Sequence, residues 1–484
     1  MREAGEGSIS DSVQPQHAEP IVTHILAIPI EVRLAILFVL GCCAGAAVNL
    51  GIYRLAWNPR PIGPWSRPHP QAPPRRLRDR LPGIGWLSLR REAALHGAGF
   101  WLRPMLLELL CGAVFVLLYL WEVQWCGLLP DHVLTPIGIL APRQIALPAI
   151  RHEQFLAHIV LFCFMLVAFW IDVDEMTIPD GVTVPGTLLG LLIMSLWPYA
   201  LLPQVTSTGL PVPQVVPAKE VQQFPVASSV WLTSPDDVPP KANDQAGLWR
   251  FVPPWEVPAV TGRAALAAAI AGFWAWCLAL LPGLWSTRHG YFRAVRVFTA
   301  RMVRERTTYG LLALAIAGSV AIAWVWSIGG AHWAGLASGL AGIVVGGGLV
   351  WIIRILASAV LHREAMGFGD VTLLAMIGAF LGWQAAIIIF FLAPLLAIVI
   401  GITRLLLHGE KEIPFGPFLC LAAAVMFWAW PTIWKYFAEP YFSQGWWLIA
   451  VLLGCLGLIV LLLPPVRWIV GRMRAGSRGQ GAGS

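Results

Sequence analysis

The sequence predicts an all-α polytopic membrane protein, a multi-helix bundle with about eleven transmembrane helices. Of its 484 residues, 57% are hydrophobic and only 12% are charged, a composition far from that of a soluble globular domain. Apolar stretches of about 20 residues recur along the chain, and that is the length an α-helix needs to cross a bilayer. Arginines gather in the segments between these stretches.

Each apolar stretch is expected to be a helix, because lipid offers no hydrogen-bond partner to an open backbone. The stretch 371–383 is shorter than the others. In chain order the expected helices are 34–56, 104–122, 153–171, 182–202, 263–284, 308–328, 335–360, 371–383, 385–407, 416–436 and 445–466.

The arginine clusters predict the orientation of the chain. They occupy the segments 57–103 and 285–307 and the tail after 466, and the positive-inside rule places such segments in the cytoplasm. Counting the expected helices returns all three to one side and puts the amino terminus outside. We expect the 285–307 arginines to anchor to anionic lipid.

Three segments are not expected to span the membrane. Residues 1–33 form a polar extension without the charged start and cleavable apolar core of a secretory signal. The outside segment 203–262 is too long for a plain connection, and the sequence leaves open whether it folds as a cap or stays extended. Residues 476–484 are of low complexity.

Two kinds of binding are excluded by composition. The net charge of +7 comes from the arginine segments, not from a basic face interleaved with exposed aromatics, so we expect no nucleic-acid partner. Seven of the 8 cysteines lie in apolar stretches and no Cys-x-x-Cys occurs, which excludes a thiolate zinc site. We therefore expect no metal.

Two aspartates at the ends of predicted helices are the candidate catalytic residues. Asp172 lies in Phe-Trp-Ile-Asp-Val-Asp-Glu-Met-Thr-Ile-Pro-Asp (169–180), and Asp370 lies in Met-Gly-Phe-Gly-Asp-Val-Thr-Leu-Leu (366–374). A carboxylate at membrane depth is costly to keep, so it is a functional candidate. Both fall at cytoplasmic helix ends in the predicted topology. This suggests a pair that shares a proton and activates water, as in aspartic proteases.

The residues beside these aspartates are interpreted by their position. Asp174, Glu175 and Asp180 are expected to belong to a solvated helix end, with Asp180 capping the next helix. Gly367 and Gly369 are expected to give a substrate backbone room beside Asp370, because glycine permits close approach of another chain.

The motifs resemble those of the type IV prepilin leader peptidases, a family of bilobal membrane aspartic proteases of the Gly-x-Gly-Asp type. That family shows Ile-Asp-x-Asp-x-x-x-x-Pro-Asp, Gly-x-Gly-Asp followed by Leu-Leu-Ala, a Gly-Ala-x-Leu-Gly-Trp run, Pro-Phe-Gly-Pro and an early Gly-Ser-Phe-x-Asn-x-x-Ile-Tyr-Arg. The similar segments of this chain, which span about 41–202 and 335–436, are 45–54, 171–180, 367–375, 378–383 and 413–418.

The resemblance implies an aspartic endopeptidase of the inner (cytoplasmic) membrane. It would cleave the basic leader from type IV prepilins or pseudopilins at the cytoplasmic face, with Asp172 and Asp370 as the catalytic pair and Gly367 and Gly369 beside the substrate. A second activity of the family methylates the new amino terminus with S-adenosylmethionine. Whether the substrate serves a type IV pilus or type II secretion stays open.

The resemblance also divides the chain into a family-like core and additions. The four glycines at 335, 339, 342 and 346 are interpreted as a packing surface and not as a nucleotide loop. The core comprises 34–122 with the basic cytoplasmic loop 57–103, the first catalytic segment 153–202 and the second catalytic segment 335–436. The additions are the extension 1–33, the insertion 203–334 with its outside loop and two extra helices, and 437–484 with an extra helix and a basic tail.

The 57–103 loop departs from the family pattern. Many members carry two Cys-x-x-Cys pairs there, whereas this chain has Ser66…His69 and Ala93…His96. Two histidines and a hydroxyl make a poor tetrahedral zinc site. We expect the loop to keep its shape by other contacts, such as Trp86 and the arginines against anionic headgroups. Methyl transfer, which depends on this region in the family, is accordingly less secure than proteolysis.

A second departure lies beside the second aspartate. Thr372 follows Asp370 by two residues, where members commonly carry lysine. An ammonium there would favour the charged carboxylate, whereas a hydroxyl can only hydrogen-bond it. We expect the active pair to titrate differently from the pairs of those members.

Two other classes of protein share some of these features. Another Gly-x-Gly-Asp intramembrane protease would also place paired aspartates at helix ends. A proton-coupled transporter uses intramembrane carboxylates as well, but it typically shows inverted repeats with broken helices in matching halves, and none is evident in the sequence. A scaffold of a secretion machine would have no reason to pair acids at one membrane face.

Overall fold

The computed structural model describes residues 19–60, 62–64, 66, 68–128, 146–202, 204–205, 231–233, 250–252, 262–281, 306–361, 366–408, 414–438, 442, 450, 451, 454 and 457. Four predictions fall wholly or largely outside these residues: the helix 445–466, the arginine segment 285–307, the basic tail after 466 and the low-complexity stretch 476–484. The amino-terminal helices and the segment between them comprise α1 (Glu19–Ala27), α2 (Ile30–Leu55), η1 (Leu77–Arg80), α3 (Ile84–Leu89), η2 (Arg90–Glu92), α4 (Ala93–His96), α5 (Leu102–Leu118) and η3 (Tyr119–Gln124). The remaining elements are α7 (Ala146–Glu175), α8 (Asp180–Leu196), η4 (Pro198–Ala200), β1 (Gln204–Val205), β2 (Trp231–Thr233), β3 (Arg250–Val252), α10 (Arg263–Ala279), α12 (Arg306–Ile328), α13 (Gly330–Leu361), α14 (Phe368–His408), α15 (Gly416–Ile433) and η9 (Trp434–Ala438).

The chain is a multi-pass, helical membrane protein. Among the described residues, 7 helices are long and apolar enough to cross a membrane: α2, α5 with η3, α7, α12, α13, α14 and α15. The apolar helices α8 and α10 are shorter. The predicted fold class is therefore confirmed, and the count of eleven helices is not.

Helix α14 contains the boundary between two of the predicted helices. Its backbone leaves the helical conformation at Gly382 (φ 83°, ψ 175°), a left-handed conformation that glycine adopts without a Cβ penalty. The Leu374 carbonyl before this break and the Ala386 side chain after it both lie close to Gly346 of α13. The chain thus bends sharply where the predicted helices 371–383 and 385–407 meet.

The glycines of α13 form a packing surface, as predicted. A Cβ on Gly342 would overlap the Gly378 carbonyl of α14, and a Cβ on Gly378 would overlap the Gly342 carbonyl. Lipid tails give helices no hydrophobic reason to associate, so small residues that let backbones approach supply the attraction by van der Waals contact. Close backbone packing of this kind holds α14, which carries Asp370, against α13.

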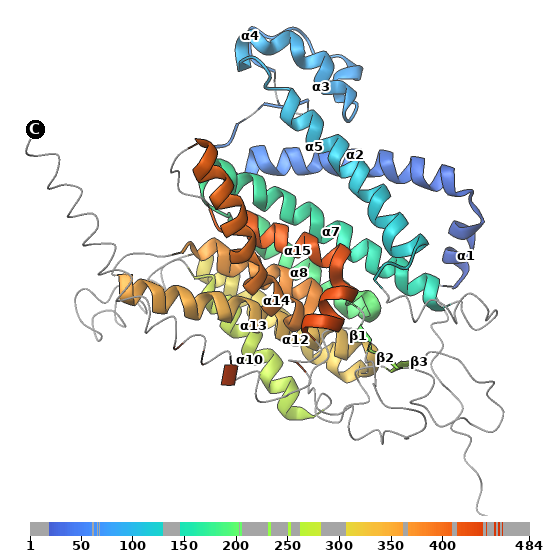
Figure 1. The fold of residues 1–484 in the computed structure, drawn as a ribbon, viewed down its shortest axis with the longest axis vertical. Coiled ribbons are helices and arrows are strands. Elements are labelled where there is room, and N and C mark those ends of the chain that lie inside the picture. The colour runs from blue at the N-terminus through green and yellow to red at the C-terminus, as the bar shows by residue number, and fades with distance from the viewer. Residues whose placement is uncertain are drawn as a thin grey trace, which may run out of the picture.

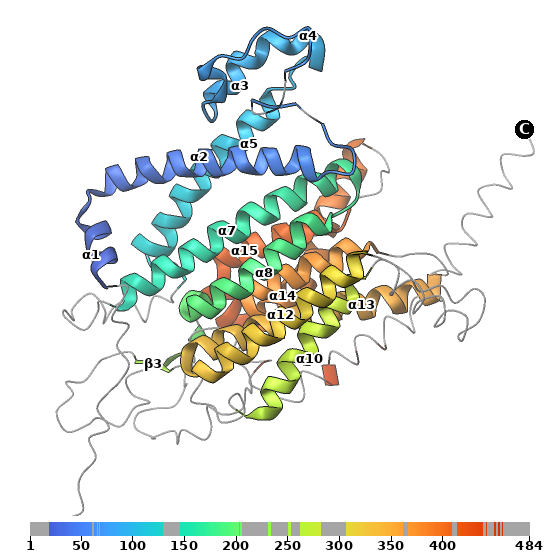
Figure 2. The ribbon, with the colours of Figure 1, turned by 180° about the vertical axis from the view of Figure 1, so that it is seen from behind.

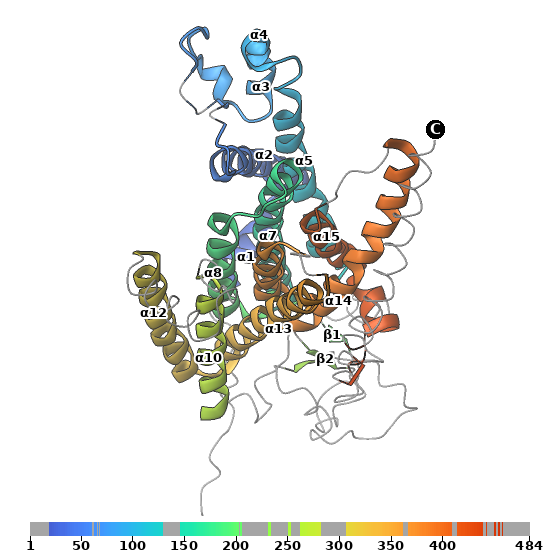
Figure 3. The ribbon, with the colours of Figure 1, turned by 90° about the vertical axis from the view of Figure 1, so that its left-hand side faces the viewer.

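The bundle has a central part and two flanking parts. In Figures 1 and 2, α2 and α5 cross on one side of the bundle, and α3 and α4 project beyond them. Helices α7, α8, α14 and α15 pack together in the centre. Figure 3 shows α12 and α10 on the flank opposite the later part of α14, and α10 packs on α12 and α13 through Phe273 and Trp276. The two helices assigned to the insertion therefore lie on the flank of the bundle, and their cluster includes Leu191 of α8.

Two segments for which the sequence predicted no helix or strand contain regular elements. The outside segment 203–262 carries a small sheet in which β1 pairs parallel to β2 and β2 pairs antiparallel to β3, with Leu232 opposite Phe251. The extension 1–33 contains α1 and the start of α2.

Candidate active site

Asp172 and Asp370 lie in one cavity, where the end of α7 meets the start of α14. The cavity measures about 410 Å³ and is lined by both carboxylates, by 176–178 after α7, by 366–369 and by Pro414 and Phe415 before α15. Both aspartates are buried, with 4% and 7% of their surface exposed, and they interact electrostatically. The structure brings the two predicted residues to one site, and their catalytic role stays a prediction.

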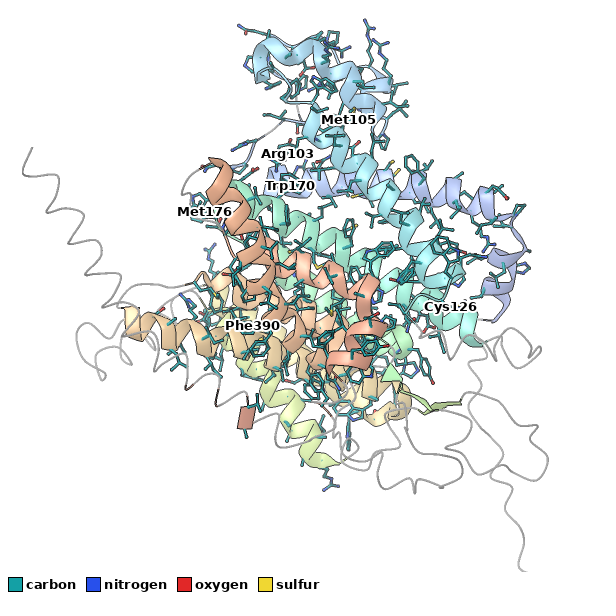
Figure 4. The ribbon with its side chains drawn as sticks, viewed as in Figure 1. Arg103, Met105, Cys126, Trp170, Met176 and Phe390 are labelled. Carbon is teal, nitrogen blue, oxygen red and sulfur yellow. The ribbon has the colours of Figure 1, made fainter. Side chains whose placement is uncertain are left out.

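Helix α7 ends in a turn that points Asp172 into this cavity. Met176, the first residue after the helix, has φ 53°, and its backbone N–H donates to the Asp172 carbonyl at 2.8 Å. A left-handed residue commonly closes a helix, but the position usually belongs to glycine because a Cβ is costly there. Figure 4 labels Met176 at this end of α7. The chain then passes through Ile178 and Pro179 into α8.

Gly367 and Gly369 both line the cavity beside Asp370, and their role in leaving room for a substrate stays a prediction. Gly369 also has a close protein neighbour, because a Cβ on it would lie 2.7 Å from the Ile178 Cβ. The Thr372 hydroxyl donates to the Gly369 carbonyl at 3.1 Å.

The first residue of α15 contacts Asp172 and was assigned no role from sequence. The Gly416 backbone N–H is directed at the Asp172 carboxylate, and a Cβ on Gly416 would lie 2.5 Å from Asp172 Oδ2. That buried oxygen has no hydrogen-bond partner within the described protein atoms. The signal in the sequence was the Pro-Phe-Gly-Pro element, whose third residue this is. Asp172 thus keeps one oxygen for a water molecule or a substrate.

A single family model matches both segments that carry the aspartates. The sequence model of the "Type IV leader peptidase family" matches residues 159–212 and 298–402, and each matched stretch contains one aspartate of the cavity. Two segments of this chain are therefore similar to that family. The family match leaves 213–297 uncovered and includes α12, so of the two helices assigned to the insertion only α10 lies in the uncovered stretch. The boundaries of the insertion stay a prediction.

Several relatives in the family carry a name that includes two activities. A prepilin leader peptidase/N-methyltransferase of Aeromonas salmonicida is 43% identical over 86 residues, 17% of this chain and 28% of that protein. A protein of the same name from Pseudomonas aeruginosa is 38% identical over 92 residues, 18% of this chain and 32% of that protein. The leader peptidase HopD of Escherichia coli is 37% identical over 101 residues, 19% of this chain and 63% of that protein.

The similarity is local in each of these cases. The alignments span about three-tenths of the length of the two bifunctional relatives. No solved structure matches the chain significantly. The likeness to the family thus rests on the two matched segments.

Two of the neighbouring carboxylates lie at an exposed helix end, as predicted, and also bind protein groups. Both oxygens of Asp174 lie 2.9 Å from Arg103 Nη1. Glu175 accepts hydrogen bonds from the backbone N–H groups of Trp57 and Asn58 at 2.6 and 3.1 Å. Asp180 is exposed and is the first residue of α8, so it does not cap that helix by a side-chain hydrogen bond. Its charge still suits the positive end of the helix dipole.

The 57–103 segment is attached to α2 and α5 through a buried carboxylate. Glu108 of α5 accepts hydrogen bonds from the Trp86 indole at 2.7 Å, from the Asn49 side chain at 3.1 Å and from the Gly83 backbone N–H. Trp86 and Glu108 are 1% and 2% exposed. Trp86 therefore holds the segment in shape, as predicted, and it does so through a polar network as well as by packing.

Two arginines of the same segment bind buried carboxylates, whereas we expected lipid headgroups as their partners. Arg75 lies 2.5 Å from Glu92, and Arg91 lies 2.5 Å from Asp79. Burial would raise the pKa of Asp79, but hydrogen bonds from the Arg76 backbone N–H and the Ser88 hydroxyl, with the charge of Arg91, hold that pKa below its usual value. Charged hydrogen bonds substitute here for a large apolar core.

The positions that replace the cysteine pairs do not form a metal site. His69 is exposed and accepts a hydrogen bond from the Gln71 backbone N–H at 3.3 Å. His96 lies 3.6 Å from Glu92 and packs against Phe100. The described residues contain no group of three or more histidine, cysteine or acidic side chains that could hold a metal, so the donors present do not fit zinc.

Proposed function

We propose that this protein is a membrane aspartic endopeptidase that removes the leader peptide from prepilins or pseudopilins at the cytoplasmic face of the inner membrane. The observation that carries the proposal is the shared cavity of Asp172 and Asp370, each of which comes from one family-matched segment. The substrate class comes from the names of the relatives, prepilin leader peptidase and leader peptidase.

The geometry supports general acid–base hydrolysis. One carboxylate takes a proton from a water molecule, which then attacks the scissile carbonyl carbon, while the other, protonated, donates a hydrogen bond to the carbonyl oxygen. The free Oδ2 of Asp172 is a suitable acceptor for that water. The proton taken from water passes to the leaving amine when the peptide bond breaks.

The surroundings of the pair suit a peptide at the edge of the membrane. Apart from the two carboxylates, the cavity wall is mainly apolar, with Met176, Ile178, Met366, Phe368 and Phe415 among its residues. With a substrate bound, such a wall would shield the reacting groups from bulk water and strengthen their interactions with the carbonyl. A substrate enters with its scissile bond extended, and Gly367 leaves the backbone room beside Asp370.

Methyl transfer to the new amino terminus is the second activity in the names of the relatives, and S-adenosylmethionine is the donor that such a reaction calls for. The cavity beside Asn49, Trp86 and Glu108 measures about 20 Å³, which is room for one water molecule and not for that donor. This cavity therefore does not fit the donor in this conformation, and we derive no step through it.

The test uses the purified full chain in detergent with a prepilin that carries a basic leader, incubated with and without S-adenosylmethionine. Gel electrophoresis measures loss of the leader, and mass spectrometry of the product reads the cleavage site and any added methyl group. We expect cleavage in both incubations. Intact substrate after incubation of both a prepilin and a pseudopilin with folded enzyme would refute the proposal. Cleavage of unrelated membrane helices instead would favour another Gly-x-Gly-Asp protease.

A further inference from the structure

The two ends of the 57–103 segment both bind the last turn of α7. Its first residues, Trp57 and Asn58, donate their backbone N–H groups to Glu175 at 2.6 and 3.1 Å. Its last residue, Arg103, binds Asp174 through Nη1 at 2.9 Å from each oxygen. A segment that leaves the bundle after α2 thus returns to the same helical turn at the start of α5.

Arg103 makes a second contact on the other side of Asp172. Its guanidinium carbon lies 4.1 Å from the centroid of the Trp170 ring, and Figure 4 shows the two residues side by side near the end of α7. The planar guanidinium stacks on an aromatic face and pairs with a carboxylate at the same time, which a lysine does less well. Contacts at 170, 174 and 175 therefore enclose Asp172.

The end of α7 needs external support. Its closing residue, Met176, is in a left-handed conformation with 54% of its surface exposed, and helix ends without strong caps open readily. Asp172 is also fixed by Gly416 from α15, but that contact acts on the carboxylate and not on the helical turn. The polar contacts of Arg103 and Glu175 act on the turn itself.

We propose that Arg103, Asp174 and Glu175 form a clamp that positions Asp172 against Asp370, so that the 57–103 segment controls the geometry of the proteolytic pair. The proposal rests on the proposed peptidase function. Arg103, Asp174 and Glu175 are positioning residues, because none of them lines the cavity of the two aspartates. A misplacement of about 1 Å at a reacting group lowers a rate by about 10²-fold, so a loose turn reduces turnover more than substrate binding.

The first test compares cleavage kinetics of Arg103→Ala, Asp174→Ala and the double variant with those of the unaltered enzyme. Each single variant should lower kcat by about tenfold and change KM by less than about twofold, because the lost contact acts on the transition state. The double variant should be no slower than Arg103→Ala, since both changes remove one interaction. Arg103→Lys keeps the charge and should recover part of kcat.

Arg78→Ala is the matched control, because Arg78 is an exposed arginine of the same segment. It removes one positive charge from the membrane surface without touching α7, and its kcat should equal that of the unaltered enzyme. An equal loss in Arg78→Ala and Arg103→Ala would overturn the clamp in favour of a general charge effect. Losses in Arg103→Ala and Asp174→Ala that multiply in the double variant would overturn it as well.

A second measurement separates the clamp from the proposed function. Hydrogen exchange of the peptide covering 170–176, followed by mass spectrometry, needs no substrate. In Arg103→Ala this peptide should exchange at least about fivefold faster than in Arg78→Ala, because the turn opens more often. Unchanged exchange would show that no clamp acts on α7, even if the enzyme cleaves prepilins. Faster exchange in Arg103→Ala, together with no cleavage by the unaltered enzyme, would support the clamp and refute the proposed peptidase function.

Discussion

Asp172 and Asp370 share one cavity, but the protein holds them there in different ways. The turn that carries Asp172 is bound by polar groups, namely Arg103 and the backbone N–H groups of Trp57 and Asn58. The helix that carries Asp370 is fixed by backbone contact, with Gly342 of α13 against Gly378 of α14.

We attribute these two kinds of contact to the surroundings, which are lipid around the packed helices and water at the edge of the membrane. Inside lipid, apolar contact gains little over contact with lipid tails, so close packing of small residues has to supply the attraction. At the membrane edge, ion pairs and hydrogen bonds are available, and the 57–103 segment uses them. Asp370 is therefore held by helix packing, whereas the position of Asp172 depends on the separate segment 57–103.

The largest effect should come from the pair itself and should be the same for both halves. Asp172→Asn and Asp370→Asn each remove a group that moves a proton, and each should lower prepilin cleavage by about 10³-fold or more. A gel assay of leader removal measures this. Asp180→Asn is the control for an acidic residue outside the cavity and should keep most of the activity, and Asp174→Asn should lose only severalfold. Full cleavage by the Asp370→Asn protein would show that Asp370 is not a catalytic residue.

The next effect concerns the contact between α15 and Asp172. Gly416→Ala places a Cβ 2.5 Å from Asp172 Oδ2, so the carboxylate has to move, and kcat should fall by about 10²-fold. The fold should persist, because one methyl group at a helix start is added. Circular dichroism and thermal unfolding in detergent check the fold, and steady-state kinetics check the rate. A rate close to that of the unaltered enzyme would show that Asp172 tolerates a shift at this site.

Packing around Asp370 is tested by a matched pair of substitutions in α13. Gly342→Ala meets the Gly378 carbonyl, whereas a Cβ on Gly348 meets no atom within 4 Å. Overpacking should destabilise Gly342→Ala by about 1–3 kcal/mol, while Gly348→Ala should be neutral or more stable by up to about 1 kcal/mol, since alanine favours helix. Unfolding in detergent ranks the two variants. Equal stability would contradict the claim that backbone contact fixes this half.

The smallest expected effect is on the stability of the 57–103 segment, and it depends on pH. The pKa of Asp79 lies below its usual value in the folded protein, so its contribution to stability is present above the unfolded pKa of about 3.9 and is lost as pH falls through the folded pKa. Asp79→Asn should therefore increase hydrogen exchange of 77–92 severalfold at pH 7, and this difference from the unaltered protein should shrink towards pH 3. A difference that persists undiminished at pH 3 would mean that the Asp79 charge does not stabilise the segment.

How far the sequence predicts this site depends on the separation between interacting residues. Asp172 and Asp370 were predictable because a charged residue beside an apolar helix stands out, and two of them at one membrane side suggest a pair. The partner of Asp174 was not predictable, because Arg103 is 71 residues away and no local pattern links them. The same holds for Glu108, whose position in an apolar stretch gave no sign of its contact with Trp86.

The fold shows the same limit. Helices were predictable from apolar length alone, and the bend at Gly382 fell within two residues of the predicted boundary between two of them. The close contact of Gly369 with Ile178 was not predictable, because sequence shows that a glycine allows a close neighbour but not which residue that neighbour is. The acceptor of the Thr372 hydroxyl, a backbone carbonyl three residues earlier, was not predictable either.

The bend at Gly382 has a consequence for the membrane around the enzyme. Only 14 residues, from Phe368 to Leu381, separate the start of α14 from the bend, and at 1.5 Å per residue they extend about 21 Å. The hydrocarbon layer of a typical bilayer is about 30 Å thick. A helix this short is accommodated by a locally thinner bilayer or by water that reaches down to its end. We therefore expect the acyl-chain length of the host lipid to affect how readily water reaches Asp370.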